Sequence, residues 1–299
     1  MTLIEEAPDT VSWKILDHCI VVLRTYALFE TFVVQLLREY LSFLSKSYKL
    51  SELGNKFVGK YTRGIGQILI DQDKARYENL DVSALVANAM AALSNGDSYE
   101  IQPEAMLRTE QNLRMDELQR LFGHCGLQEF ENWVTNHVAV RGFFAAQSRL
   151  SETAATELKQ IVDYRNEAAH GDVDQVLGTE ILLEVTEFFE SLLQSITDFV
   201  QHDILRRAKE LGTAQVLGVV SECFRDDIVV AKITNARLKV GDIVYILGRR
   251  ITMIGEIKSI QLDGVDHLDA EIATQREVGL RLGVSPSKGC ELIRLNQPD

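Results

Sequence analysis

VDYRNEAAHGD, residues 162–172, ends a predicted helix over residues 152–170 that closes on Gly171 in the C-cap role. With about 100° per residue, Arg165 lies at the centre of the apolar face of this helix, within about 60° of Leu158 and Ile161. An unpaired guanidinium is very costly to bury. We therefore expect the fold to present Arg165 to an anion, a partner surface or a cavity that admits a charged ligand.

The same helix carries two further polar groups beside Arg165. Asn166 and His170 form the neighbouring edge, one turn apart. The last turn is where the helix dipole favours a protonated ring. A histidine that moves protons near neutral pH, next to a fixed cation, suits attack of a ribose 2′-hydroxyl on phosphorus, for which no metal is required. The alternative is an arginine in a structural salt bridge and a histidine that helps to cap its helix.

Composition and charge limit the class of protein. The chain has 299 residues, is 46% hydrophobic and 25% charged, and carries a net charge of -13, which argues against indiscriminate nucleic-acid binding. The four cysteines are scattered, with no CxxC pair, so neither a zinc site nor a disulfide framework is expected. The acidic N-terminus lacks the layout of a signal peptide, and no apolar run approaches the roughly 18 residues that span a bilayer. We expect a cytoplasmic protein.

Hydrophobic periodicity divides the chain into a helical part and a strand-rich part. Helices are predicted over residues 11–46, about 55–70, 81–93 with Asp81 as N-cap, 113–125, 127–147 and 179–211. After Gly212, short β-branched runs separated by Gly, Asp and Asn turns predict a small antiparallel sandwich or barrel. We therefore predict an all-α bundle over residues 1–208 and a β domain over residues 212–299.

The motif and its context resemble a known superfamily. RNEAAHG, with four residues between Arg165 and His170, resembles the R-x4-6-H motif of the HEPN superfamily (higher eukaryotes and prokaryotes nucleotide-binding). The segments RTYALFETFVVQLLREYL and NLRMDELQRLFGHCGLQEF look like the corresponding parts of its RiboL-PSP and MAE branches. The resemblance covers most of residues 11–205.

This resemblance implies a helical bundle that dimerises with two motif helices facing each other across a cleft. Such a dimer cuts RNA without metal or cofactor and leaves a 2′,3′-cyclic phosphate. The resemblance makes His170 the proton-transfer residue, Arg165 the transition-state cation and Asn166 a group that orients His170 or a phosphate oxygen. Glu30, in the first helix, is implied as an acid that holds Arg165 or Asn166, or else is a solvated glutamate at the edge of the bundle.

The strand-rich part resembles the β-barrel domain II of translational GTPases. The resemblance rests on LKVGDIVYILG, GEIKSIQLDG, EVGLRLG and KGCELIR, over about residues 212–296. It implies a module that directs the protein to a structured RNA such as tRNA. Arg249 and Arg250, at a predicted hairpin tip, are candidates to grip a phosphate, although paired arginines on a turn are usually just solvated. Residues 206–299 hold 14 basic and 13 acidic residues, so any grip on RNA must be local.

Two glycine-containing segments partly match nucleotide-binding motifs. GNKFVGKY, residues 54–61, nearly matches a phosphate-binding loop, but Tyr61 stands where a Ser or Thr hydroxyl must hold Mg²⁺, and no buried strand precedes it. GIGQIL, residues 64–69, lacks the third glycine of a dinucleotide fingerprint. We expect neither segment to bind a nucleotide in these ways.

The sequence thus predicts a cytoplasmic, homodimeric, metal-independent endoribonuclease without cofactor and without membrane contact. The superfamily implies a toxin or an anti-phage defence effector, with an antitoxin or regulatory partner. Two alternatives stay open: a catalytically silent HEPN scaffold that binds RNA, a nucleotide or a protein partner, and a translation-associated protein that works through its barrel.

Overall fold

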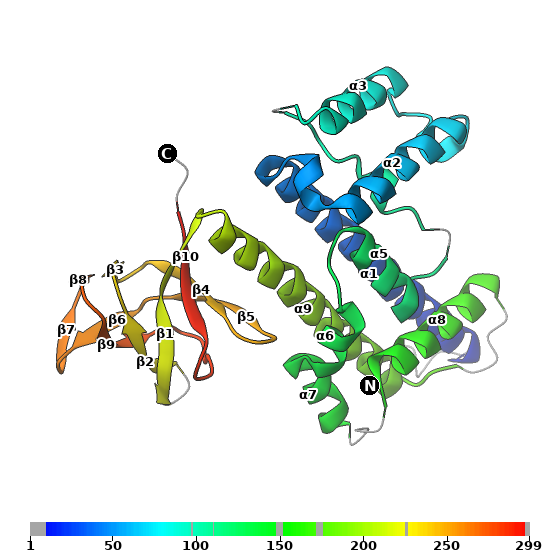
Figure 1. Ribbon diagram of the computed structural model, residues 1–299. Helices are drawn as coiled ribbons and strands as arrows, with labels where there is room; N and C mark the ends of the chain where they lie inside the picture. The colour runs from blue at the N-terminus through cyan, green and yellow to red at the C-terminus, as the bar shows by residue number, and fades with distance from the viewer. Residues whose placement is uncertain are drawn as a thin grey trace. The chain divides into compact units, whose positions relative to one another are not determined.

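The computed structural model describes residues 10–96, 98–109, 111–147, 152–171, 176–224 and 227–296. The chain divides into two compact units, Met1–Ile196 and Thr197–Asp299, the first helical and the second mostly strand (Figure 1). The acidic N-terminal stretch, residues 1–9, lies outside the described residues. The predicted class, a helical region followed by an antiparallel β region, is confirmed.

The helical unit is built on long helices with short ones packed around them. Its helices are α1 (Thr10–Ser47), α2 (Asn55–Ile70), α3 (Val82–Leu93), α4 (Pro103–Met106), α5 (Met115–His124), α6 (Phe130–Asn136), α7 (Val138–Ala146), α8 (Ala154–His170) and α9 (Thr179–Glu210), with 3-10 turns at Leu50–Leu53 and Ala75–Tyr77. The predicted N-cap is confirmed, because the Asp81 carboxylate accepts the backbone N–H of Ala84 at 3.0 Å.

Aromatic side chains form much of the core of the helical unit. Phe29 of α1 and Phe189 of α9 lie with ring centroids 4.9 Å apart, and Tyr26 contacts both rings. Six apolar residues of α9 that are spaced three and four apart are all buried, namely Leu182, Val185, Phe189, Leu192, Ile196 and Phe199. They form the core face of this amphipathic helix.

The single helix predicted over residues 127–147 is wrong, because the structure contains two helices there. His137 separates α6 from α7 with an extended backbone, φ −70° and ψ 140°. Its Nδ1 accepts the backbone N–H of Ala139 at 3.3 Å and so caps α7. The buried imidazole provides an N-cap that periodicity alone does not reveal.

Gly64 allows α2 and α4 to approach closely. A Cβ added at Gly64 would lie 2.0 Å from the carbonyl oxygen of Ala105 in α4. We expect Gly64→Ala to lower the free energy of unfolding by about 1–3 kcal/mol, because the two backbones must separate. Gly66→Ala in the same helix is the matched control, since an added Cβ there meets nothing within 4 Å. Urea denaturation measures both, and equal stability of the two variants would contradict the close approach.

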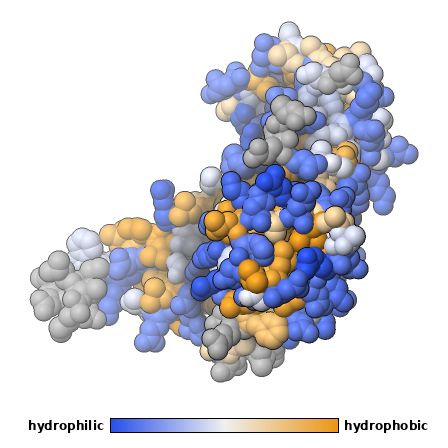
Figure 2. All heavy atoms as spheres, turned by 90° about the vertical axis from the view of Figure 1, so that its left-hand side faces the viewer, coloured by the Kyte–Doolittle hydropathy of each residue, from blue (hydrophilic) through white to orange (hydrophobic). Residues whose placement is uncertain are grey.

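Helix α1 corrects the expectation that no apolar segment is long enough to span a bilayer. Residues Ser12–Ser47 are long and apolar enough to cross a membrane, by length and composition only. One side of the helix, including Val22 and Leu37, is buried in the helical unit, whereas Leu16, Ile20 and Leu28 are exposed. Core packing explains the apolar character of the buried side, whereas the exposed side chains form an apolar surface on α1. Figure 2 shows one face of the molecule, on which hydrophobic side chains form patches between hydrophilic ones.

The second unit is an antiparallel β structure. Its strands are β1 (Ala214–Phe224), β2 (Ile228–Ile233), β3 (Ala236–Lys239), β4 (Ile243–Leu247), β5 (Thr252–Glu256), β6 (Ser259–Leu262), β7 (Val265–His267), β8 (Asp269–Ile272), β9 (Arg276–Arg281) and β10 (Glu291–Leu295). Among the described residues, eight strands form one sheet in the order β5-β4-β10-β1-β2-β9-β6-β7, and β3 pairs with β8. Alternate residues such as Val229, Ala231 and Ile233 point into a common apolar core.

The predicted barrel does not close among the described residues, because the edge strands of the sheet, β5 and β7, do not pair with each other. The β-branched segment RRITMIGEIKSIQL, residues 249–262, is interrupted at Ile257 and Lys258, so that β5 pairs with β4 whereas β6 pairs with β9. Near the interruption, Glu256 N–H donates to Leu282 O at 3.2 Å and Lys258 N–H to Arg281 O at 2.7 Å. These bonds tie the bend between β5 and β6 to the end of β9 without a continuous ladder.

Helix α9 begins in the first unit and ends in the second. Within the second unit, Leu205 packs against Leu247 and Ile293 of the sheet. Lys209 pairs with Glu291, and a His202 ring nitrogen lies 3.2 Å from Gly248 O. The change in composition used to set the predicted domain limits at 208 and 212 coincides with the end of α9, whereas the division into compact units falls inside this helix.

Candidate active site

Helix α8 carries the motif and is well defined at both ends. The Thr153 hydroxyl accepts the backbone N–H of Thr156 at 3.2 Å, and the Thr156 hydroxyl accepts that of Thr153 at 3.1 Å, which forms a capping box. At the other end Gly171 adopts a left-handed conformation with φ 75°, which ends the helix. Because α8 packs against α1, the polar residues of its last turns lie beside the first helix.

Arg165 is held by a neighbouring amide and an aromatic ring. Its Nη1 donates to Asn166 Oδ1 at 3.3 Å, and its Cζ lies 5.7 Å from the ring centroid of Tyr26 in α1. The side chain is half-buried, and within the part of the chain that the structure describes no carboxylate lies at ion-pair distance from it. Asp163, two residues earlier, is paired instead with Arg114 at 2.8 Å. The guanidinium is therefore positioned without being neutralised.

Asn166 connects Arg165 to the loop before α5. Its Oδ1 accepts Asn112 Nδ2 at 2.8 Å as well as the guanidinium. One amide oxygen thus fixes two groups from different parts of the chain. The resemblance implied that Asn166 orients His170 or a phosphate oxygen, whereas its hydrogen bonds in the structure join it to Arg165 and Asn112.

Tyr26 joins Glu30 to this arrangement. Its hydroxyl accepts the backbone N–H of Leu113 at 2.6 Å. Burial first, and then the charge of Glu30 and its hydrogen bond to the phenol, raise the pKa of Tyr26 well above its usual value. The phenol therefore stays protonated and can donate to the Glu30 carboxylate. Glu30 reaches the neighbourhood of Arg165 through Tyr26 rather than by a direct ion pair.

His170 lies in the last turn of α8 with an exposed side chain. No hydrogen-bond partner is present for its ring among the described residues. The helix C-terminus provides a partial negative charge beside it. The imidazole is therefore accessible to a ligand that approaches this end of α8.

Tyr26 and Asn112 were missed as functional candidates by the sequence reasoning. Both contact the motif from segments that are distant in sequence, and neither lies at a spacing from Arg165 that matches a known motif. The only available signal was the aromatic residue one turn before Glu30 in the first helix. Tertiary structure was needed to bring these groups together.

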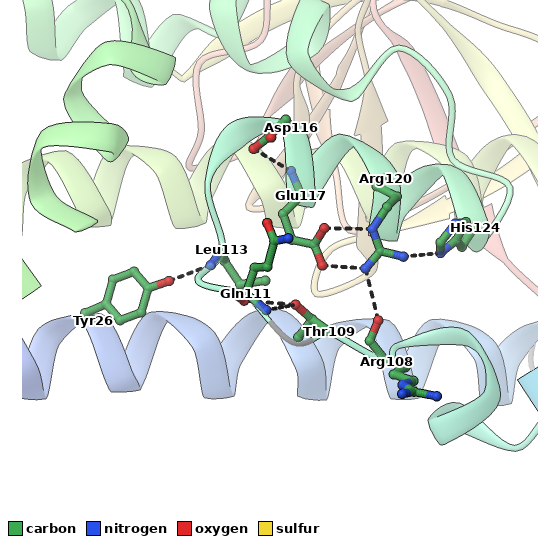
Figure 3. A network of polar contacts seen from close by, with 9 residues as sticks. All are labelled: Tyr26, Arg108, Thr109, Gln111, Leu113, Asp116, Glu117, Arg120 and His124. Carbon is green, nitrogen blue, oxygen red and sulfur yellow. Dashed lines mark hydrogen bonds and ion pairs between the residues drawn. The ribbon is translucent and has the colours of Figure 1, made fainter. Parts of the chain in front are cut away.

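The loop that contacts Tyr26 also leads to a partly buried polar network at α5 (Figure 3). Arg120 Nε donates to Glu117 Oε2 at 2.7 Å, its Nη2 bonds Glu117 Oε1 and the carbonyl oxygen of Arg108, and its Nη1 lies 3.3 Å from His124 Nδ1. Hydrogen bonding to Arg120 lowers the pKa of Glu117. Since a guanidinium only donates, His124 Nδ1 is the acceptor.

This network predicts a specific loss of stability in acid. Burial, followed by the charges of Lys60 and Arg120, lowers the pKa of His124 from 6.5 to about 4. The unfolded chain therefore binds more protons than the folded chain between about pH 4 and 6.5, and the free energy of unfolding falls as pH drops through that window. We expect His124→Gln to reduce this fall, as measured by urea denaturation at a series of pH values. Part of the fall should remain, because burial also lowers the pKa of His18 and His202. An unchanged pH profile would contradict the assignment.

Arg249 and Arg250 lie in the loop of the β4–β5 hairpin. The pairing of Leu247 with Thr252 and the hydrogen bond from Gly248 N–H to Ile251 O define this tight turn. Arg249 is exposed and Arg250 is half-buried. Among the residues described, neither has an ion-pair partner, so both guanidinium groups are available at the tip of the hairpin.

A metal centre is not assembled by the described residues, among which no group of three or more His, Cys, Asp or Glu side chains is placed to hold an ion. The four cysteines are free thiols.

Comparison with known proteins identifies the helical part. Residues 2–202 match the RiboL-PSP-HEPN family model. That match includes α1, α8 and the whole Arg165–His170 motif. No curated protein matches the chain.

Proposed function

Because this chain belongs to the RiboL-PSP-HEPN family, we propose that its helical unit is a metal-independent endoribonuclease in which Arg165 and His170 act on the scissile phosphate. Family membership supports an RNA-related role. The observation that carries the proposal is Arg165, a guanidinium positioned by Asn166 and Tyr26 and left without a carboxylate partner among the described residues. Such a cation is suited to hold the charge that develops on phosphoryl oxygens.

The proposed reaction is an internal transfer within RNA. The 2′-oxygen bonds to the adjacent phosphorus while the bond from phosphorus to the 5′-oxygen breaks, which leaves a 2′,3′-cyclic phosphate and a 5′-hydroxyl. His170 moves a proton from the attacking hydroxyl or to the leaving oxygen, and Arg165 stabilises the charge on phosphorus-bound oxygens. Asn166 acts as a positioning residue for Arg165, and Glu30 acts through Tyr26.

Two protomers would supply the base and the acid together. One α8 helix carries a single motif histidine, whereas proton removal and proton donation in one step need two groups. A homodimer related by a two-fold axis presents two copies of the motif to one groove. The exposed apolar side chains of α1 support this arrangement, since they provide a surface for a second copy: Trp13, Leu16, Ile20, Leu28 and Phe32.

Purified protein incubated with total RNA in EDTA tests the proposal. Cleavage that survives chelation and disappears in His170→Ala supports it. RNA that stays intact in EDTA and is cut once Mg²⁺ is added would contradict a metal-independent reaction.

A second candidate function is a catalytically silent HEPN scaffold that binds RNA, a nucleotide or a protein partner. The observation in its favour is the exposed His170 ring, which no described residue orients. Tight RNA binding without any cutting in the same incubation would support the scaffold.

The biological setting follows from the superfamily rather than from any residue. We propose that the protein acts in the cytoplasm as a toxin or an anti-phage defence effector, that its substrate is an RNA such as tRNA, and that an antitoxin or regulatory partner restrains it. The charge of -13 is compatible with an enzyme that does not bind RNA at random.

The β unit is proposed as the module that selects the RNA, in the manner of a translation-factor barrel. We expect Arg249→Gln combined with Arg250→Gln to change substrate choice and to weaken RNA binding, while cleavage of a short unstructured RNA is retained. Lys232→Gln combined with Lys239→Gln is a control of equal charge change at exposed positions of the same unit. Cleavage patterns on total tRNA report the difference, and identical patterns for both double variants would exclude the selecting role.

A further inference from the structure

A cavity with a basic lining lies between α2 and α5, separate from the Arg165 motif. Its volume is about 570 Å³, within the range of ligand sites. We call it the α2–α5 pocket, and the residues that line it include Lys56, Phe57, Lys60, Arg63, Arg120 and His124.

The lining of the α2–α5 pocket contains two lysines, two arginines and no carboxylate. Lys56, Lys60 and Arg63 follow one another at helical spacing and so share a face of α2, while Arg120 comes from α5. This concentration of positive charge occurs in a chain whose net charge is -13. The local excess of positive charge in the pocket is therefore opposite in sign to the charge of the whole chain.

Three of these cations lack a counter-charge. In the described parts of the chain Lys56, Lys60 and Arg63 form no ion pair, whereas Arg120 is paired with Glu117. Burial first, and then the charges of Arg120 and Arg63, lower the pKa of Lys60. Like charges gathered in a partly buried place oppose folding, and a bound anion would relieve that repulsion.

The remaining lining groups suit recognition of phosphate oxygens. Gln119 and Gln128 bring amides to the rim. Phe57 is buried and forms an apolar wall. Cations with amide donors around an open space are the usual means by which proteins hold phosphate groups.

A second hollow of about 410 Å³ adjoins the first and shares Lys60 and Arg120 with it. Its other lining residues include Arg108, which is paired with Asp71 at 3.0 Å, and Glu117, whose carboxylate is paired with Arg120. Two hollows that share their cations leave room for more than one phosphate group.

We propose that the α2–α5 pocket is a binding site for phosphate groups, carried either by a free nucleotide or by an RNA chain. This proposal stands whether or not Arg165 and His170 cut RNA. It also gives the GNKFVGKY segment a role: the segment is the first half of α2, not a phosphate-binding loop, and its two lysines contribute their charges from one helical face.

Direct binding to the full-length protein tests the pocket, in the His170→Ala background so that no RNA is consumed. The probes are inorganic pyrophosphate, ATP, and a short single-stranded RNA with 2′-O-methyl riboses, with adenosine as the uncharged control. Lys60→Gln combined with Arg63→Gln removes two pocket cations. Lys14→Gln combined with Lys46→Gln removes two exposed lysines of α1 and is the matched control.

We expect the pocket variant to bind at least one phosphate probe about tenfold more weakly than the control variant at low salt, with a shallower dependence of affinity on salt. Binding of pyrophosphate and ATP without competition from RNA identifies a free nucleotide as the ligand. Binding of RNA alone, or competition between RNA and pyrophosphate, identifies the RNA backbone.

Two results would overturn the proposal: no binding of any phosphate probe, or equal affinities for the two double variants. Circular dichroism checks that the pocket variant is folded. If it is not, Lys56→Gln, which changes an exposed residue at the rim, replaces it and is expected to weaken the same probe by a smaller factor.

Discussion

His170→Ala is expected to reduce RNA cleavage by about 10²–10⁴-fold, because it removes the group proposed to transfer protons. The loss should appear in kcat rather than in KM, because the imidazole is proposed to act in the transition state and not in binding the substrate. Single-turnover cleavage of a labelled RNA measures the effect.

Stability should change little in this variant. The His170 side chain is exposed, and no hydrogen-bond partner for it is present among the described residues, so we expect a change within about 0.5 kcal/mol. His267→Ala, at an exposed histidine of β7, is the matched control and should keep full activity. Equal activity of the two alanine variants would remove His170 from the mechanism.

Arg165→Ala is expected to lower cleavage by about 10²–10³-fold, the range seen when one donor to a transition-state oxyanion is lost. The alanine variant should still fold, because Arg165 forms no ion pair with the residues described and loses only its contact with the Tyr26 ring and one hydrogen bond. A cation–π contact at a partly exposed site contributes about 0.5–1 kcal/mol.

Arg165→Lys separates charge from geometry. A lysine keeps the positive charge but lacks the planar fork that can bond two phosphoryl oxygens. We expect activity between that of the wild type and that of Arg165→Ala, with an unchanged oligomeric state by light scattering. Loss of folded structure in the alanine variant would show instead that Arg165 is a structural residue. Arg141→Ala, at an exposed position of α7, is the control.

Local signals made several parts of the fold predictable. The apolar spacing in α1 and α9 gave nearly the correct bounds, and Asp81 marked the start of α3, because these features depend on residues within one helix. The break at His137 escaped prediction, since the imidazole cap depends on its rotamer rather than on sequence spacing. The switch of pairing between β5 and β6 escaped for a similar reason, because partners are chosen by tertiary packing.

The candidate site was predictable only along α8 itself. The helical wheel placed Arg165 beside Asn166, and the structure contains a hydrogen bond between them. Tyr26 and Asn112 act across long sequence separations, so no spacing rule finds them. The α2–α5 pocket was not predictable from GNKFVGKY alone, because the charges of the pocket come from two helices that only tertiary packing brings together.

The most direct test of a metal-independent HEPN nuclease is the product end formed in EDTA from an RNA cut at one mapped position. The account predicts a 2′,3′-cyclic phosphate and a 5′-hydroxyl, identified by mass spectrometry, with no cut when the nucleotide before the scissile bond is 2′-deoxy. Cleavage of the 2′-deoxy substrate, or a 5′-phosphate at the cut, would contradict attack by the ribose hydroxyl and with it the roles given to Arg165 and His170.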